Sequence, residues 1–486
     1  ILEAENNIGR FYSEIGDHQT AVEHYKRSLD LAEQLGDSEL QSDKLNEYGI
    51  GLTNIGDYDG AIAALRKSLS IAEWEGGYVY VNLAEALMYK GELEKAVGLL
   101  RPRNPTHVDI GYYHLLNGQY KQAQEIYKNN LLSSLKERAK DFRGFTQSID
   151  SVFAARTGLG LAYEGLQDYF KASYHFKEAQ KLLERQRDSL SLDHRLYFMG
   201  VMDWMLPHLE PYEGMVRISE FLPGGLRDSL YHAEFTRGRL FTESAARSYG
   251  APDTRLPAEL WSRENQLNQK IFSAAMNAEA ARRSTDQQTF LRLDTGLTDL
   301  KKEREKLVEI LRRDYPEYAA VRYPTPLFVE EFALQTEEIL IEFEVTNPYT
   351  KAFVVKNGRV ALSYNVRLSR NELTALVRKY RAFFEEVSGT AQLAAFDPKL
   401  GNQLYKLLLQ PALEATENGV PLASTDARII VAPDEILSIL PFESLVVSLP
   451  KRLHSPSGRF GPAPVGVKYV ADSYDIAYAH SATALT

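Results

Sequence analysis

Residues 428–445, RIIVAPDEILSILPFESL, decide how the C-terminal part of the chain folds. Four consecutive apolar residues, Ile429 to Ala432, precede a turn at Pro433-Asp434. A short apolar run bounded by turn residues is typical of a strand covered on both faces, as in the centre of a parallel or mixed sheet. Leu440-Pro441-Phe442 then ends one element and begins the next, because proline fits inside neither. The stretch predicts a central strand whose end faces a loop.

The segments before and after this strand supply the rest of a sheet domain. Glu338 to Glu344 is predicted as a strand, and Lys351–Val355 with Val360–Tyr364 as a hairpin around Asn357-Gly358. A helix is predicted after the capping box Ser369-x-x-Glu372. The remaining predicted elements are a helix from Asp397-Pro398 and a last strand, Tyr474 to Tyr478.

The N-terminal half repeats one pattern, which pairs two amphipathic segments around a glycine. The five units begin at Ile8, Tyr48, Leu83, Ile110 and Leu159. Glycine is expected to end the first helix of a unit in the left-handed conformation, at Gly16, Gly56, Gly91 and Gly118, with Gln167 in this place in the fifth unit. A small residue lets the second helix seat against the first, at Ala21, Ala61, Ala96, Ala123 and Ala172. The pattern resembles the tetratricopeptide repeat (TPR) and predicts a stack of helix pairs.

The spacing of the units is uneven. The five alanines lie 40, 35, 27 and 49 residues apart, whereas a TPR unit is about 34 residues. The short interval predicts either a clipped unit around Arg101–Pro105 or residues absent from the numbered chain. The long interval predicts an extended helix across Leu131–Arg143.

Between the repeats and the sheet domain, two further helical segments are expected. Tyr231-x-x-Glu234-Phe235-x-x-Gly238-Arg239-Leu240-Phe241 resembles the helix that closes such arrays. Leu256 to Asp314 has apolar residues recurring at three and four and predicts a helical hairpin. We interpret it as a spacer, with a lever that couples the array to the next domain as the alternative. Proline-rich Tyr315–Pro326 marks the next boundary.

Three blocks of the C-terminal part, in order, resemble the CHAT domain, a relative of caspase-like cysteine peptidases that follows TPR repeats. They are Leu404–Pro411, Ile429–Leu445 and Tyr474-x-Ile476-x-Tyr478-x-x-Ser481-x-Thr483-x-Leu485. The resemblance implies an α-solenoid of TPR helix pairs followed by an α/β caspase-like (CHAT) sheet domain. The expected domains are residues 1–250 for the array, 251–320 for the spacer and 321–486 for the N-terminal, pseudo-protease part of the CHAT domain.

In CHAT relatives the catalytic His and Cys lie after the Ser-x-Thr-x-Leu block, and this chain contains no cysteine. We therefore expect no catalytic residue within the 486 residues, and no cofactor or metal site. His480-Ser481 is a poor nucleophile pair, because neighbours at a strand end point apart. Asp434 is expected to cap local backbone. His107 and His114 have no clear carboxylate partner, which argues against a metal site.

The composition limits the class of partner and the setting. The formal net charge is −10, which argues against a general nucleic-acid binder; nucleic acid would be reached only through a partner complex. The sequence has no run of 18 apolar residues and no secretory leader at its start, so no membrane span and a cytoplasmic location are expected.

The resemblance implies a regulated cysteine endopeptidase whose repeats bind a protein partner that controls proteolysis of a protein substrate. Such systems include bacterial defence modules. The partner-binding face is expected on the first helices of the units, at Asn6, Arg10, Asn46, Glu85 and Tyr112. The alternatives are a non-enzymatic scaffold or adaptor with a caspase-like platform, and the N-terminal product of self-cleavage.

Overall fold

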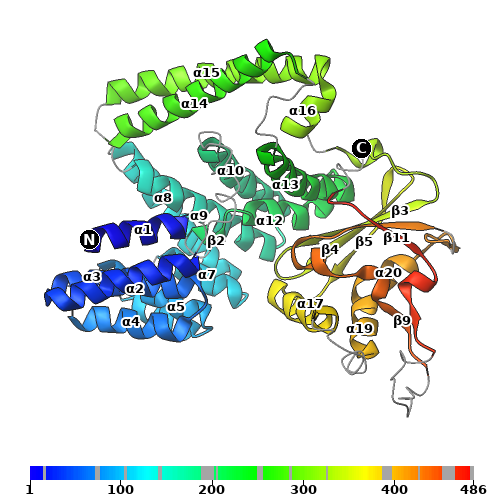
Figure 1. The fold of residues 1–486 in the computed structure, drawn as a ribbon, viewed down its shortest axis with the longest axis horizontal. Coiled ribbons are helices and arrows are strands. Elements are labelled where there is room, and N and C mark those ends of the chain that lie inside the picture. The colour runs from blue at the N-terminus through cyan, green and yellow to red at the C-terminus, as the bar shows by residue number, and fades with distance from the viewer. Residues whose placement is uncertain are drawn as a thin grey trace. The chain divides into compact units, whose positions relative to one another are not determined.

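The computed structural model divides the chain into two compact units, Ile1–Gly214 with Pro257–Leu307 and Met215–Leu256 with Val308–Thr486 (Figure 1). It describes residues 1–14, 18–71, 77–102, 107–140, 145–187, 202–203, 206–248, 256–283, 287–323, 327–385, 397–424, 427–450 and 466–481. Gly16, predicted to end the first helix, lies outside the described residues. No helix among these ranges is long and apolar enough to cross a membrane.

The first unit is built mainly of consecutive helices that pack as antiparallel pairs. Their bounds are α1 Leu2–Glu14, α2 His18–Leu35, α3 Ser38–Asn54, α4 Tyr58–Ile71, α5 Gly77–Tyr89, α6 Leu93–Leu100, α7 Val108–Leu116, α8 Tyr120–Lys140, α9 Phe145–Gly165 and α10 Tyr169–Arg187. Each second helix also packs against the first helix of the next pair. The predicted array of helix pairs is therefore present.

The predicted helix ends are confirmed. Gly56, Gly91 and Gly118 have φ values of 84°, 88° and 68°, and Gln167 adopts the same left-handed conformation at 60°. The residue after each one donates its N–H to a carbonyl five residues back, as in Asp57 to Leu52 and Asp168 to Tyr163. This is the hydrogen bond that closes a helix in a Schellman motif. A left-handed residue therefore ends the first helices α3, α5, α7 and α9.

Close contacts inside each pair explain the small residues. The five repeat alanines are fully buried, at Ala21, Ala61, Ala96, Ala123 and Ala172. A Cβ at Gly49 would lie 2.6 Å from Leu65 Cγ, and one at Gly160 would lie 2.4 Å from Phe176 Cε1.

The uneven spacing of the repeat units also has a structural cause. The 27-residue interval is accommodated by the short helices α6 and α7, of 8 and 9 residues, and the 49-residue interval by α8 and α9, of 21 each.

Two long helices, α14 Ala258–Arg283 and α15 Gln287–Asp314, form the predicted hairpin and are linked by Arg263 and Glu303, 3.7 Å apart. Short strands β1 Met202–Asp203 and β2 Leu206–Pro207 pair with each other. Helix α12, Glu210–Ile218, follows them.

The second unit is an α/β domain around a five-stranded sheet of order β11-β8-β3-β4-β5. Its strands are β3 Glu338–Val345, β4 Thr350–Lys356, β5 Arg359–Val366, β8 Arg428–Ala432 and β11 Asp475–Tyr478. The smaller strands are β6 Thr416–Glu417, β7 Val420–Pro421, β9 Val446–Ser448 and β10 Lys468–Tyr469. The helices are α13 Gly225–Ser248, α16 Pro316–Arg322, α17 Arg370–Glu385, α19 Pro398–Leu408 and α20 Gln410–Leu413.

Strand β8 is central, as its apolar run predicts. It runs parallel to β3 on one side and to β11 on the other, with Ile429 opposite both Ile339 and Ile476. Ile429–Val431 therefore pairs with Ile476–Tyr478 in one sheet. The hairpin β4–β5 is antiparallel and turns at Asn357-Gly358, whose φ values are 52° and 67°.

Both faces of the sheet are covered (Figure 1). Ile339, Ile341 and Phe343 point into a core with α17, α19 and α20. The alternate residues, Leu340 and Ile430 among them, pack against Leu230 and Ala233 of α13. Because every second side chain goes to the opposite face, a strand with two buried faces needs an uninterrupted apolar run.

Candidate functional site

The parallel strands β3, β8 and β11 have their carboxyl ends on the same side of the sheet. A buried arginine contacts the main chain at all three ends. Arg237 of α13 is 8% exposed. Its Nη1 donates to Phe343 O at 3.0 Å, and its Nη2 donates to His480 O at 2.9 Å and to Pro433 O. One guanidinium therefore fixes the main chain near the end of β3 and just after β8 and β11.

Carboxylates surround this guanidinium. Glu342 Oε1 lies 3.3 Å from Nη1, and Asp434 Oδ1 lies 4.0 Å from Nε. Burial opposes the charge of Arg237, but the nearby carboxylates, Glu342 and Asp434 first, outweigh it and raise its pKa. The cation is therefore permanent. We call Arg237, Glu342, Asp434 and the three accepting carbonyls the strand-end cluster.

Asp434 has a different role from the one predicted. Its Oδ2 accepts the N–H of Val345, the last residue of β3, at 2.8 Å. It makes no side-chain cap to the short helix Glu435–Ile439 that it precedes. The prediction of a local cap is wrong. Because β3 and β8 end side by side, the Asp434 side chain reaches the N–H of Val345, which is distant in sequence, instead of the N–H groups of its own turn.

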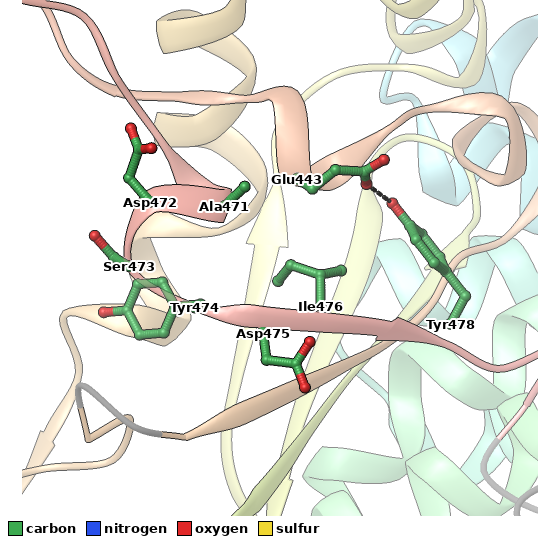
Figure 2. A pocket seen from close by; sticks show the side chains of 8 residues that line it. All are labelled: Glu443, Ala471, Asp472, Ser473, Tyr474, Asp475, Ile476 and Tyr478. Atoms are coloured by element: carbon green, nitrogen blue, oxygen red, sulfur yellow. Dashed lines mark hydrogen bonds between the residues drawn. The ribbon is translucent and has the colours of Figure 1, made fainter.

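The Leu-Pro-Phe segment anchors the edge strand. Phe442 is fully buried, and its N–H donates to Tyr478 Oη at 2.8 Å. The Tyr478 hydroxyl in turn donates to Glu443, and burial together with this bond raises its pKa. Figure 2 shows these two side chains pointing toward each other above β11. The tyrosine thus links β11 to the segment that follows β8.

An open hollow of about 650 Å³ lies beside β11, lined by Glu443, Ala471–Ile476 and Tyr478 (Figure 2). Its carboxylates have partners. Asp475 lies 3.4 Å from Arg428 Nε, and Asp472 accepts the N–H of Tyr469 at 2.8 Å. Among the described residues β11 pairs only with β8, so the hollow lies along a free sheet edge, which a further strand could extend.

The strand-end cluster holds backbone in place. His480 is exposed whereas Ser481 is 1% exposed, so the two side chains lie in different environments. The described residues contain no group of three or more His, Cys, Asp or Glu side chains that could hold a metal ion. What the cluster can do chemically is fix where three strand ends lie relative to one another.

Sequence reasoning missed Arg237, although a signal was present. Leu230, Ala233, Glu234 and Arg237 recur at the spacing of one helical stripe, and all four are buried. Two charged residues on an apolar stripe indicate buried partners.

The five residues predicted to bind a partner lie on first helices of the array. Asn6 is 4% exposed and Arg10 is exposed, both on α1. Asn46 of α3 accepts from Asn82 of α5 at 2.8 Å, which joins two consecutive first helices. Glu85 of α5 and Tyr112 of α7 are partly buried. The structure therefore places Asn46 beside α5, the helix that carries Glu85.

Among the residues predicted to bind a partner, Glu85 has a strongly raised pKa. Burial, and then the negative charge of Asp109, raise its pKa from 4.5 to about 8. The carboxylic acid form therefore predominates at neutral pH.

Replacing Glu85 with glutamine is expected to flatten part of the pH dependence of stability. The folded state holds the proton up to about pH 8 and the unfolded state only to about 4.3, so ionisation of Glu85 destabilises the wild type as pH rises across this window. Glu85→Gln should match the wild type near the lower limit and exceed it by about 5 kcal/mol above the upper one, because a pKa difference of about 3.7 corresponds to about 1.4 kcal/mol per unit. Urea unfolding across this range measures the difference.

The control is Glu39→Gln, which removes the same charge from an exposed position on α3. It should leave the slope of stability against pH unchanged. Parallel slopes for the wild type and Glu85→Gln would contradict the assigned ionisation.

Comparison with known protein families supports the repeat character of the first helices of this array. Residues 1–73, which span α1 to α4, match the family model of the tetratricopeptide repeat. No curated protein matches the chain. Stacked repeats of this type present extended surfaces to other proteins, so the N-terminal array has the character of a protein-interaction element.

Proposed function

We propose that the chain is the regulatory and N-terminal portion of a TPR–CHAT cysteine endopeptidase. In this proposal the array binds a protein partner, and partner binding controls proteolysis of a protein substrate. The α/β unit is the pseudo-protease part of the CHAT domain, and the catalytic His and Cys belong to sequence after Thr486. By resemblance, we assign the system to bacterial defence.

The strand-end cluster carries the proposal. In open α/β sheets, functional sites lie beyond the carboxyl ends of parallel strands. Arg237 reaches this side of the sheet from α13, which follows the helix pairs α1–α10 in sequence, and binds carbonyls near the end of β3 and just after β8 and β11. A shift of α13 would change the position of all three strand ends together. Coupling between two sites requires an element with two arrangements, and in this proposal α13 is that element.

The order of elements also supports the proposal. The Leu404–Pro411 block forms α19 and α20, the Ile429–Leu445 block begins with β8, and β11 follows as its parallel neighbour. This is the order in which the three blocks resemble a CHAT domain, and it lies behind helix pairs whose first members match a TPR model.

A non-enzymatic adaptor is the second candidate, favoured by the absence of cysteine from all 486 residues. In that case the α/β unit is a platform for a partner. The strand-end cluster would then serve stability alone.

Reading and expressing the coding sequence beyond Thr486 separates the two. The protease requires one strand ending in His and a later one ending in Cys. The extended protein should label with a thiol-reactive peptide probe and cleave a co-expressed substrate only when its partner is present, and Cys→Ser should abolish both. An extension with neither residue contradicts the protease and leaves the adaptor.

A further inference from the structure

A histidine of the fifth repeat unit positions a partly exposed arginine. His175 of α10 accepts from Arg156 of α9, with Nδ1 3.2 Å from Nη1, and its ring stacks on Tyr163 with centroids 5.4 Å apart. Burial, and then the positive charge of Arg156, lower the pKa of His175 to about 4. The ring is therefore neutral at neutral pH, so it accepts from the guanidinium without balancing its charge.

The first unit contains the same arrangement with the opposite charge. His24 Nδ1 lies 2.7 Å from Glu5 Oε2, and the ring stacks on Tyr12 with centroids 5.6 Å apart. In both units 19 residues separate the histidine from its charged partner, so Glu5 and Arg156 occupy equivalent positions. A carboxylate can be balanced by a protonated histidine, but a guanidinium cannot. The fifth unit therefore keeps a positive charge where the first unit has a carboxylate.

Arg156 forms no ion pair with a carboxylate in the part of the chain that the structure describes. Besides His175, it contacts the face of Tyr174, with the guanidinium carbon 5.3 Å from the ring centroid. The hydrogen bond and the ring fix the direction of the guanidinium before any ligand binds. Its other N–H groups can then donate to a carboxylate without first losing much rotational freedom.

Two aromatic side chains on α10 beside this arginine are exposed. Phe170 is 70% exposed and Tyr174 is 55% exposed, and because they are four residues apart they lie next to each other on one helix face. The equivalent positions of the other four units are also exposed but carry polar or small residues, namely Gln19 and Glu23, Asp59 and Ala63, Glu94 and Gly98, and Lys121 and Glu125. The repeat itself therefore requires no aromatic residue there, whereas aromatic residues and arginine are enriched at protein interfaces.

We propose that Arg156, Phe170 and Tyr174, together the unit-five surface, bind a segment of the protein partner in which an Asp or Glu lies beside an aromatic or aliphatic residue. The inference rests on the proposed partner-binding function of the array and states which chemistry the partner presents. The carboxylate supplies the missing counter-charge through charge-assisted hydrogen bonds to the guanidinium. The apolar neighbour covers the two exposed rings.

The charges around the unit-five surface favour a peptide over a nucleic acid. Nucleic-acid affinity depends on several cations that each neutralise a phosphate. Lys171 pairs with Asp168 at 2.5 Å and Lys181 pairs with Glu178 at 2.6 Å, so two of the three lysines between residues 170 and 181 already have a counter-charge. One fixed arginine beside two rings matches one carboxylate and one apolar side chain better than a run of phosphates.

The test selects peptides on the full chain. A phage library of random dodecapeptides is first depleted on the Arg156→Glu variant and then panned on the immobilised wild type, and enriched sequences are synthesised with a fluorescein label for anisotropy titrations. We expect the enriched peptides to share an Asp or Glu next to an aromatic or aliphatic residue. Replacing that acid by its amide should weaken binding at least about tenfold, the usual effect of losing one charged hydrogen-bonding group.

The first unit supplies substitutions that this repeat already accommodates. Arg156→Glu restores the glutamate–histidine contact of unit one, and Phe170→Gln with Tyr174→Glu installs the residues that unit one has at these exposed positions. Each variant should keep the wild-type melting temperature and bind the peptides at least about tenfold more weakly. Lys121→Glu, a charge reversal at an exposed site on α8, should alter neither property.

A charge exchange separates a binding residue from a structural one. A peptide in which lysine replaces the acid should bind Arg156→Glu more tightly than it binds the wild type, which an arginine that only stabilises α9 and α10 would not produce. Failure to enrich any peptide, enriched peptides without an acid, or equal affinity for the wild type and Arg156→Glu would overturn the unit-five surface. So would tighter binding of a labelled twelve-nucleotide oligouridine than of the best peptide. None of these results bears on whether the array controls a protease, which the extended sequence tests separately.

Discussion

Arg237→Ala is expected to destabilise the α/β unit by about 3–5 kcal/mol, the usual loss when one member of a buried ion pair is removed. The substitution leaves Glu342 buried without its cation and removes the donors to Phe343 O, Pro433 O and His480 O. Burial of the carbonyls without partners adds to the loss. Urea unfolding followed by circular dichroism measures it.

Arg227→Ala is the matched control, because this second arginine lies on the same helix. Its Nε donates to Glu330 at 2.7 Å, but both side chains are about half exposed, at 44% and 53%. Exposed pairs contribute little, so the variant should lie close to the wild type. Arg237→Lys should recover only part of the loss, since one ammonium group cannot reproduce the planar fork of a guanidinium. Equal stabilities of the two alanine variants would show that Arg237 does not hold the strand ends.

Local signals in the sequence predicted most elements correctly, because each signal acts over a few residues. The Asn357-Gly358 turn adopts the left-handed conformation that such a pair favours. Ser369 and Glu372 form their reciprocal cap, with the Ser369 N–H donating to Glu372 Oε2 at 2.8 Å. The central position of β8 followed from its apolar run in the same way.

The strand-end cluster could not be predicted by the same means. The three carbonyls that Arg237 binds are 106, 196 and 243 residues away in sequence. No turn or helix rule links such positions, so only the sheet order shows that they meet. Asp434 illustrates the same limit, because its partner Val345 lies 89 residues away on a neighbouring strand.

Asp109, a buried residue whose charge raises the pKa of Glu85, was missed for another reason. An acidic residue in the first turn of a helix is a common stabilising feature, and Asp109 occupies that position in α7. Its sequence context therefore gives no sign that the carboxylate is buried. Glu85 and Tyr112 were predicted because their repeat positions place them on the first-helix face, whatever lies beneath.

The second large effect is expected at Gly158 of α9. A Cβ there would lie 2.3–2.4 Å from three ring carbons of Tyr127, and a Cβ at Gly111 on the other side would lie 2.8 Å from the ring. The ring cannot move away from one helix without meeting the other. Gly158→Ala should therefore destabilise the array by about 3 kcal/mol, the upper part of the range for overpacking, as measured by urea unfolding.

Gly98→Ala provides the opposite control within the same array. Gly98 lies inside α6, is exposed, and has no atom within 4 Å of an added Cβ. Alanine there should stabilise by about 0.5–1 kcal/mol, because glycine is a poor helix former. Replacing the ring in Tyr127→Leu should reduce the loss of stability that Gly158→Ala causes. A double-mutant cycle should then show a coupling of about 1–2 kcal/mol. Additive losses would mean that the ring does not pass between α7 and α9.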